Sequence, residues 1–372
     1  MWNKLNFWIK NHKKVVVIGT PIAIILLFAL IVGMIRYLSP TQGDVVITHP
    51  EKKEDLKPVL EASLLNGTLV SPEKKNQHVS AAMIENSTDA RPQVGLTSAD
   101  VVYEAVTEGG ITRFMALFSQ KYPEKAGPIR SARSYFIDWL SEFDAFYVHA
   151  GGSPTALSRI SAYKIKDYPH SNDGTFWREP KAGVASEHTL FANISKIFTN
   201  ATTKRGWPAT FDFESWKFKD PEASLELGGT LEVDFSSANY KVVWRIDKAT
   251  NTFLREMAGV VHKDGLTGEQ ISAKTVLVMT VKNSPNAPYA SGKQSEWTMD
   301  TIGSGTASVF VDGKQIRGTW KKPSRTERTR FYDETDAEIT LNRGNIWVEV
   351  IPHTGSYTFT KETPPAPETT TE

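Results

Sequence analysis

The strongest constraint on this chain is an uninterrupted apolar stretch near its N-terminus, "VVVIGTPIAIILLFALIVGMI" at residues 15–35. A helix rises about 1.5 Å per residue, so a helix of this length is long enough to cross the hydrocarbon core of a bilayer. Four lysines precede the stretch, whereas only Arg36 follows it closely. The positive-inside rule therefore predicts a cytoplasmic N-terminus and a single-pass cell-membrane protein whose domains, after about Leu38, are extracellular.

A cleaved signal peptide is the alternative to this anchor. The apolar stretch is longer than a typical signal-peptide core, and "GMIRYLSPTQG" after it lacks an A-x-A-like cleavage site. The sequence therefore favours an uncleaved signal anchor.

Composition excludes several classes of function. The 43 basic and 42 acidic residues give a net charge of +1, so no global basic field indicates a nucleic-acid partner. The chain has no cysteine, which excludes disulfides, thiol catalysis and cysteine metal sites. No nucleotide-binding or hydrolase fingerprint occurs, and His149, His170 and His188 lack metal-ligand spacing. We expect no cofactor and no metal.

Shifts in composition divide the chain. The predicted segments are a basic cytoplasmic tail (1–14), the transmembrane anchor (15–38), a polar tether (39–69), an α/β N-terminal domain (70–217), a β-rich C-terminal domain (218–360) and a disordered Pro/Thr/Glu tail (361–372).

Local patterns predict an α+β fold. Short apolar runs at 112–120 and 144–150 are typical of strands, whereas "ARSYFIDWLSEF" and "EHTLFANISKIFTNA" have helical periodicity. This alternation predicts a layered α/β arrangement in the first half. The second half consists mostly of strand patterns separated by turns such as Asp312-Gly313, so we expect a mainly antiparallel β-domain there.

Two arginines in "PIRSAR" need partners. If Ser131 caps a helix that runs to about Phe143, Arg133 lies at the N-terminal edge of its buried face and Arg130 precedes it. An unpaired guanidinium there is too costly to bury. An anion held by both arginines and the helix N–H groups is one solution.

An internal ion pair is the other solution. Glu104, Glu108 and Asp138 are the carboxylates that the sequence offers to these arginines. The sequence leaves both alternatives open and slightly favours a binding site.

A glycine turn follows the next predicted strand. "DAFYVHAGGSP" indicates a strand, a glycine turn and a helix that Ser153 caps and Pro154 begins. Ligands usually bind at the C-terminal ends of strands in open α/β sheets, although such a turn needs glycine for conformational reasons alone.

Further candidates complete the predicted site. A basic run, "GTWKKPSRTERTRFYDE", is more often a solvated hairpin than a patch for an anionic polymer or lipid head groups. His188 near a helix start is more often a packed surface histidine than an anion contact. The predicted ligand-binding residues are Arg113, Arg130, Arg133, Ser134, His149, Gly151, Gly152, Ser153, His188 and Arg325.

Three long blocks carry a resemblance to a known family. "ARPQVGLTSADVVYEAVTEGGITRFMALF", "AGPIRSARSYFIDWLSEFDAFYVHAGGSP" and "GTWKKPSRTERTRFYDE" with "NIWVEVIP" resemble the YerB-like lipoproteins of Gram-positive bacteria, over residues 75–352. The resemblance implies an exported protein with an N-terminal and a C-terminal domain that meet near residue 220. It transfers no catalytic residue, because the molecular function of the family is uncharacterised. Without a cysteine at the export segment, this chain should be anchored by a helix.

Two functional classes remain open. The first is a non-enzymatic cell-envelope protein that binds an anionic ligand or envelope partner at an arginine-lined pocket. The second is a phosphotransferase similar to the LytR-CpsA-Psr enzymes, acting on a lipid-pyrophosphate-linked cell-wall polymer. Ser134-Tyr135 stand where that family's pattern supplies a metal-binding aspartate. The sequence therefore favours binding over catalysis.

Overall fold

The computed structural model describes residues 2–11, 13–38, 59–286 and 295–363. The described chain falls into two units, Met1–Lys57 and Pro58–Glu372. Most of the predicted tether (39–58) and of the predicted disordered tail (364–372) lies outside the described residues.

The first unit contains helices α1 (Trp2–Asn11) and α2 (Lys13–Leu38). The side chains of α2 are described for residues 24–38, and apolar ones such as Ile24 and Phe28 are exposed. Among the described residues, no helix combines the length and the hydropathy needed to cross a membrane. Side chains 15–23 of the predicted span lie outside the described set, and the anchor stays a prediction.

The second unit is built on a ten-stranded mixed sheet. In spatial order its strands are β21 (Arg330–Asp333), β20 (Lys314–Lys322), β19 (Gly303–Val311), β16 (Thr275–Val281), β23 (Ile346–Pro352), β4 (Val101–Val106), β5 (Thr112–Phe118), β3 (Ser80–Glu85), β6 (Phe146–His149) and β7 (Asp167–Pro169). The pairs β16–β23, β23–β4, β3–β6 and β6–β7 are parallel. The remaining neighbours are antiparallel.

A second sheet is antiparallel throughout. Its strands are β14 (Val260–Val261), β13 (Thr252–Met257), β12 (Val242–Asp247), β11 (Gly229–Asp234) and β24 (Ser356–Lys361), and β15 (Ser272–Ala273) also pairs with β13. Four two-stranded sheets join β1 (Glu61–Ala62) to β2 (Leu69–Val70), β8 (Phe176–Arg178) to β9 (Leu190–Ala192), β10 (Phe218–Lys219) to β22 (Leu341–Asn342), and β17 (Asn283–Pro285) to β18 (Trp297–Met299). The α-helices among the described residues of this unit are α3 (Ser134–Leu140), α4 (Pro154–Ala162) and α5 (Ile194–Thr203).

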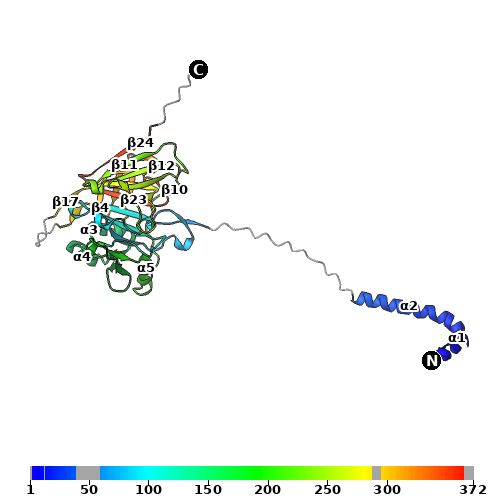
Figure 1. The fold of residues 1–372 in the computed structure, drawn as a ribbon. Helices are drawn as coiled ribbons and strands as arrows, with labels where there is room; N and C mark the ends of the chain where they lie inside the picture. The colour runs from blue at the N-terminus through cyan, green and yellow to red at the C-terminus, as the bar shows by residue number, and fades with distance from the viewer. Residues whose placement is uncertain (1, 12, 39–58, 287–294, 364–372) are drawn as a thin grey trace, which may run out of the picture. The chain divides into compact units, whose positions relative to one another are not determined.

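The large sheet lies between the helices and the smaller sheet. Figure 1 shows α3, α4 and α5 on one side of β4 and β23, and β11, β12 and β24 on the other. All six side chains of β4 are buried, as expected for a strand covered on both faces. Tyr103 stacks on Trp139 of α3, and its neighbour Glu104 points to the opposite face, because side chains alternate along a strand.

Charged side chains lie inside the interface between the two sheets. Arg255 of β13 pairs with Glu104, and both side chains are fully buried. Glu349 of β23 is the register partner of Glu104 and accepts a hydrogen bond from Trp244 Nε1 at 2.6 Å. Burial raises the pKa of Glu349 well above its ordinary value, and the nearby Glu104 carboxylate raises it further. Both effects favour the protonated form of Glu349 beside the Glu104–Arg255 pair.

The structure confirms the predicted α+β class. The strand at 112–118, the strand at 146–149 and the hairpin around Asp312-Gly313 form as expected. Both halves of the chain contribute strands to the ten-stranded sheet. The described residues of the predicted tether include β1 and the buried Leu65. The segment "EHTLFANISKIFTNA" was predicted as one helix, but it contains β9 and then α5, which Asn193 caps.

Glu349→Gln should remove the loss of folding stability that we expect of the wild type as pH rises. Glu349 has a raised pKa, so the folded chain retains a proton that the unfolded chain loses above about pH 4.5. The wild-type free energy of unfolding should therefore fall, relative to the variant, as pH rises above that value. A tenfold difference in proton affinity between the folded and the unfolded chain corresponds to about 1.4 kcal/mol. Urea unfolding from pH 4 to pH 9 measures this difference. Glu232→Gln, at an exposed position of β11, is the control. Curves of equal slope for wild type and Glu349→Gln would contradict the expectation.

Candidate functional site

Arg133 has an internal carboxylate partner. Its Nε and Nη2 atoms donate to Glu108 at 2.6 and 2.9 Å, and Nη1 donates to the Ala132 carbonyl at 2.8 Å. Burial alone would lower the pKa of Arg133, but Glu108 outweighs it and the pKa is raised. The ion pair with Glu108, one of the alternatives from the sequence, is the arrangement that the structure has.

The predicted helix start was wrong by two residues, because Ser131 was expected as the cap. Helix α3 begins at Ser134, and Arg133 is its N-cap in an extended conformation. Ser131 lies before the helix, where its hydroxyl donates to the Ala150 carbonyl at 2.9 Å. The Ser134 amide donates to Glu296 at 2.9 Å, so the N-terminus of α3 is occupied by a side chain of this protein.

Arg130 and His188 share a buried glutamate. Arg130 Nε lies 3.1 Å from Glu85 Oε1, and His188 Nδ1 lies 2.8 Å from Glu85 Oε2. Glu187 adds a second carboxylate at 3.1 Å from Arg130 Nη2. Both predicted residues therefore belong to one ion-pair network.

Arg113 lies opposite Glu85 in the register of β5 and β3. Its Nη1 donates to the Ser131 carbonyl at 2.7 Å. Burial and the charge of Arg133 lower the pKa of Arg113 to about 10. The structure thus brings Arg113 within electrostatic range of Arg133 and bonds its guanidinium to a backbone carbonyl of the protein.

The glycine turn after β6 is held by His149. The imidazole Nδ1 lies 2.7 Å from the Gly151 carbonyl and Nε2 lies 2.7 Å from Asp167 Oδ1. Gly151 has φ +68°, a conformation that favours glycine. The Ser153 cap of α4 is confirmed, since its hydroxyl accepts from the Ala156 amide at 3.0 Å.

Ser153 also donates to Glu296 at 2.7 Å. Gly152 packs beside Leu157 and pairs with Ala132 through an isolated bridge. The residues around this turn therefore have structural partners, and we place the candidate site elsewhere.

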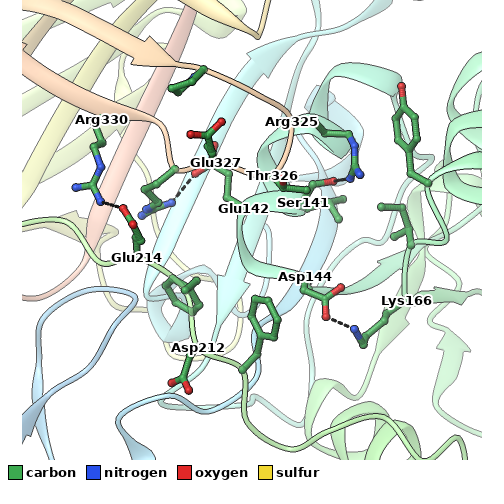
Figure 2. A pocket seen from close by; sticks show the side chains of 18 of the residues that line it. Ser141, Glu142, Asp144, Lys166, Asp212, Glu214, Arg325, Thr326, Glu327 and Arg330 are labelled. Carbon is green, nitrogen blue, oxygen red and sulfur yellow. Dashed lines mark hydrogen bonds and ion pairs between the residues drawn. The ribbon is translucent and has the colours of Figure 1, made fainter.

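A cavity of about 570 Å³ lies beside the other end of α3. Four stretches contribute residues to its walls: 140–145 at and after the end of α3, 163–166 after α4, 211–214, and 321–332 from the hairpin of β20 and β21. Figure 2 shows their charged side chains around this space. Of the predicted site residues, Arg325 lines this cavity.

The Arg325 guanidinium is held by a hydroxyl group and an aromatic ring. Its Nη1 donates to Ser141 Oγ at 2.8 Å, and its guanidinium lies 4.4 Å from the centre of the Tyr163 ring. Within the described residues, no carboxylate pairs with it. Figure 2 shows the Arg325 side chain directed toward Ser141.

Glu142 anchors the hairpin that carries Arg325. Its carboxylate accepts from Lys322 Nζ at 2.8 Å, from Arg328 Nη1 at 2.7 Å and from Thr329 Oγ1 at 2.5 Å. All four side chains are buried. Burial lowers the pKa of Lys322. The expectation of a solvated hairpin at this basic run was wrong for Lys322 and Arg328, because Glu142 provides a buried partner.

Most other charges of the cavity are paired internally. Lys166 pairs with Asp144, Lys321 with Asp336, and Arg330 with both Glu214 and Glu338. The dashed contacts of Lys166 and Arg330 are visible in Figure 2.

Sequence reasoning missed Ser141, Glu142 and Tyr163 as site residues, because no local pattern links them to a hairpin more than 150 residues away.

Arg133→Met should destabilise the protein. The substitution leaves the Glu108 carboxylate, whose side chain is 21% exposed, without its bidentate partner. We expect a loss of roughly 3 kcal/mol, at the lower end of the range for broken buried pairs. Denaturant unfolding measures it, and a double variant with Glu108→Gln should recover most of the loss. An unchanged unfolding free energy in Arg133→Met would show that the pair contributes nothing.

The comparisons with known proteins agree with this architecture. Residues 65–208 match the family model described as "Protein of unknown function (DUF3048) N-terminal domain", and residues 231–348 match the corresponding C-terminal domain. The chain is 27% identical over 289 residues to the Bacillus subtilis protein named "Putative lipoprotein YerB", covering 76% of this chain and 83% of the relative. The crystal structure of the YerB protein from Bacillus subtilis superposes with a TM-score of 0.69 at 25% identity, covering 80% of this chain and 99% of the other.

Proposed function

Because the chain belongs to the YerB-like DUF3048 family of unknown function, we propose that it is a cell-envelope protein that binds an anionic ligand in the cavity around Arg325. The sequence predicted an arginine-lined pocket around Arg130 and Arg133. We propose the same kind of pocket, with Arg325 at its centre.

One observation carries this proposal. Arg325 is the arginine of the cavity without a carboxylate partner in the described part of the chain, whereas Arg328 and Arg330 are paired. Ser141 and the Tyr163 ring hold its guanidinium in place before any ligand arrives. A guanidinium ordered in this way is suited to a carboxylate or phosphate, because little further ordering is needed on binding.

The proposed location of the domains after about Leu38 is the outer side of the cell membrane. In this proposal α2 anchors the chain in the membrane and the N-terminus lies in the cytoplasm. The relative from Bacillus subtilis is named as a lipoprotein, which supports an envelope location. None of the 372 residues is a cysteine, so we assign the anchor to α2. Exposed apolar side chains along α2, such as Leu27 and Leu30, support this assignment because water is an unfavourable surrounding for them.

Binding is favoured over phosphotransfer. Three arginines line the cavity, as the phosphotransferase alternative requires, but two of them are neutralised by glutamates. Across the described residues, no three His, Asp or Glu side chains are grouped in a way that would hold a metal ion. The arginines alone do not distinguish the two functions, and the pairing of two of them with glutamates favours binding as the function that we propose.

Arg325→Gln should weaken anion binding without unfolding the protein. We expect at least one of two probes, N-acetylalanine or pyrophosphate, to bind the wild type, and the variant to bind it about tenfold more weakly or worse, because a charge-assisted contact is lost. Isothermal titration with the detergent-solubilised full chain measures both affinities.

Arg317→Gln is the matched control for this test. Arg317 is an exposed arginine on β20 that does not line the cavity. Wild-type affinity in Arg325→Gln, or equal losses in the two variants, would contradict the proposed site.

Protease added to intact cells should degrade the chain beyond Leu38. The positive-inside rule places those residues outside the membrane, so a cytoplasmic marker should survive while they are digested. Immunoblotting against the C-terminal region measures the digestion. Full protection would contradict the orientation, and a mature chain about 35 residues shorter would indicate that a signal peptidase had removed the apolar stretch.

A further inference from the structure

The cavity contains an unpaired negative charge as well as the unpaired Arg325. Glu327 lies two residues after Arg325, lines the cavity and is exposed. In the described residues, no cation or hydrogen-bond donor contacts its carboxylate. Arg325 and Glu327 are therefore both available to a ligand, and they have opposite charges.

Buried Lys322 sets the conformation of the loop that carries both groups. Its Nζ donates to the Arg325 carbonyl at 3.0 Å and to the Glu327 carbonyl at 2.7 Å. Lys322 is itself held by Glu142 at 2.8 Å. Figure 2 shows the Glu327 carboxylate and the Arg325 guanidinium at separate places along this wall, on either side of Thr326.

The charge arrangement disfavours a simple dianion. Such an ion would be attracted by Arg325 but would meet the unpaired carboxylate of Glu327 close by. A ligand with one carboxylate and one ammonium group complements both charges. Lys166 and Arg330, two of the other cations that line the cavity, are already matched by Asp144 and Glu214, whereas the exposed Lys164 has no such partner among the described residues.

The apolar part of the wall provides room for side chains. Phe211, Phe213 and Ile165 line the cavity together with the Tyr163 ring. A volume of about 570 Å³ lies within the range of pockets that enclose a small organic ligand. A short peptide combines charged termini with side chains that such a wall accommodates.

We propose that the ligand is a short peptide with a free carboxylate and a free ammonium group. Arg325 binds the carboxylate, Glu327 binds the ammonium group, and the aromatic wall contacts the peptide side chains. This inference rests on the proposed anion site at Arg325 and names the class of ligand that the site takes.

The test compares three forms of one tripeptide, Ala-Phe-Ala, on the full chain in detergent. The forms are the free peptide, the N-acetylated peptide and the C-terminal amide, measured by isothermal titration. We expect the free peptide to bind at least about tenfold more tightly than either blocked form. Glu327→Gln should remove the preference over the N-acetylated form alone, and Arg325→Gln the preference over the amide alone.

Matched controls separate this effect from general changes in charge. Glu334→Gln and Arg317→Gln alter an exposed glutamate and an exposed arginine outside the cavity, and both should bind like the wild type. Thermal melting of each variant reports whether it is folded.

The outcomes distinguish the two proposals. If the free and N-acetylated peptides bind equally and both depend on Arg325, the peptide inference is overturned and the anion site stands. If the peptides bind but their affinity does not depend on Arg325, both the proposed anion site and the peptide inference are overturned. If none of the three forms binds at millimolar concentration, the inference of a peptide ligand is overturned.

Discussion

The contact between Glu142 and the cations of the β20–β21 hairpin determines the arrangement of the candidate site. Lys322 and Arg328 are buried with this single carboxylate, 180 and 186 residues away along the chain. Removing one partner of such a cluster leaves an uncompensated buried charge, which is strongly destabilising. The cluster therefore fixes the hairpin against the end of α3, and that fixed position places Arg325 over Ser141 and Tyr163.

A second buried cluster connects the two sheets. Arg255 reaches Glu104 of the large sheet and lies over the Trp347 ring at 4.6 Å. In the same interface His262 Nδ1 accepts from Arg255 Nη1 at 2.6 Å and Nε2 donates to Gln93 Oε1 at 2.9 Å. Burial lowers the pKa of His262 well below its ordinary value. The pKa shifts of His262 and Glu349 both favour the neutral form of the group. The interface therefore places the buried Glu104–Arg255 pair beside two groups whose charged forms are disfavoured by burial.

Local sequence signals predicted local structure well. The Ser153-Pro154 start of α4 and the Asp312-Gly313 turn depend on residues a few positions apart, and both form. The Arg133–Glu108 pair joins residues 25 positions apart, and the sequence could only name Glu108 among several partners. The burial of Lys322 against Glu142 could not be predicted from the local sequence, because a basic run gives no information about a carboxylate from the other half of the chain.

The interleaved order of the large sheet makes the two halves of the chain dependent on each other. Strand β4 of the first half lies between β5 and β23, and β23 of the second half lies between β4 and β16. A chain that ends near residue 220 would leave the hydrogen-bonding edge of β4 open and Glu104 without Arg255. Unpaired strand edges promote association between chains. Synthesis must therefore reach the last strands before the first half of the sheet is protected, and a truncated product would be prone to aggregate.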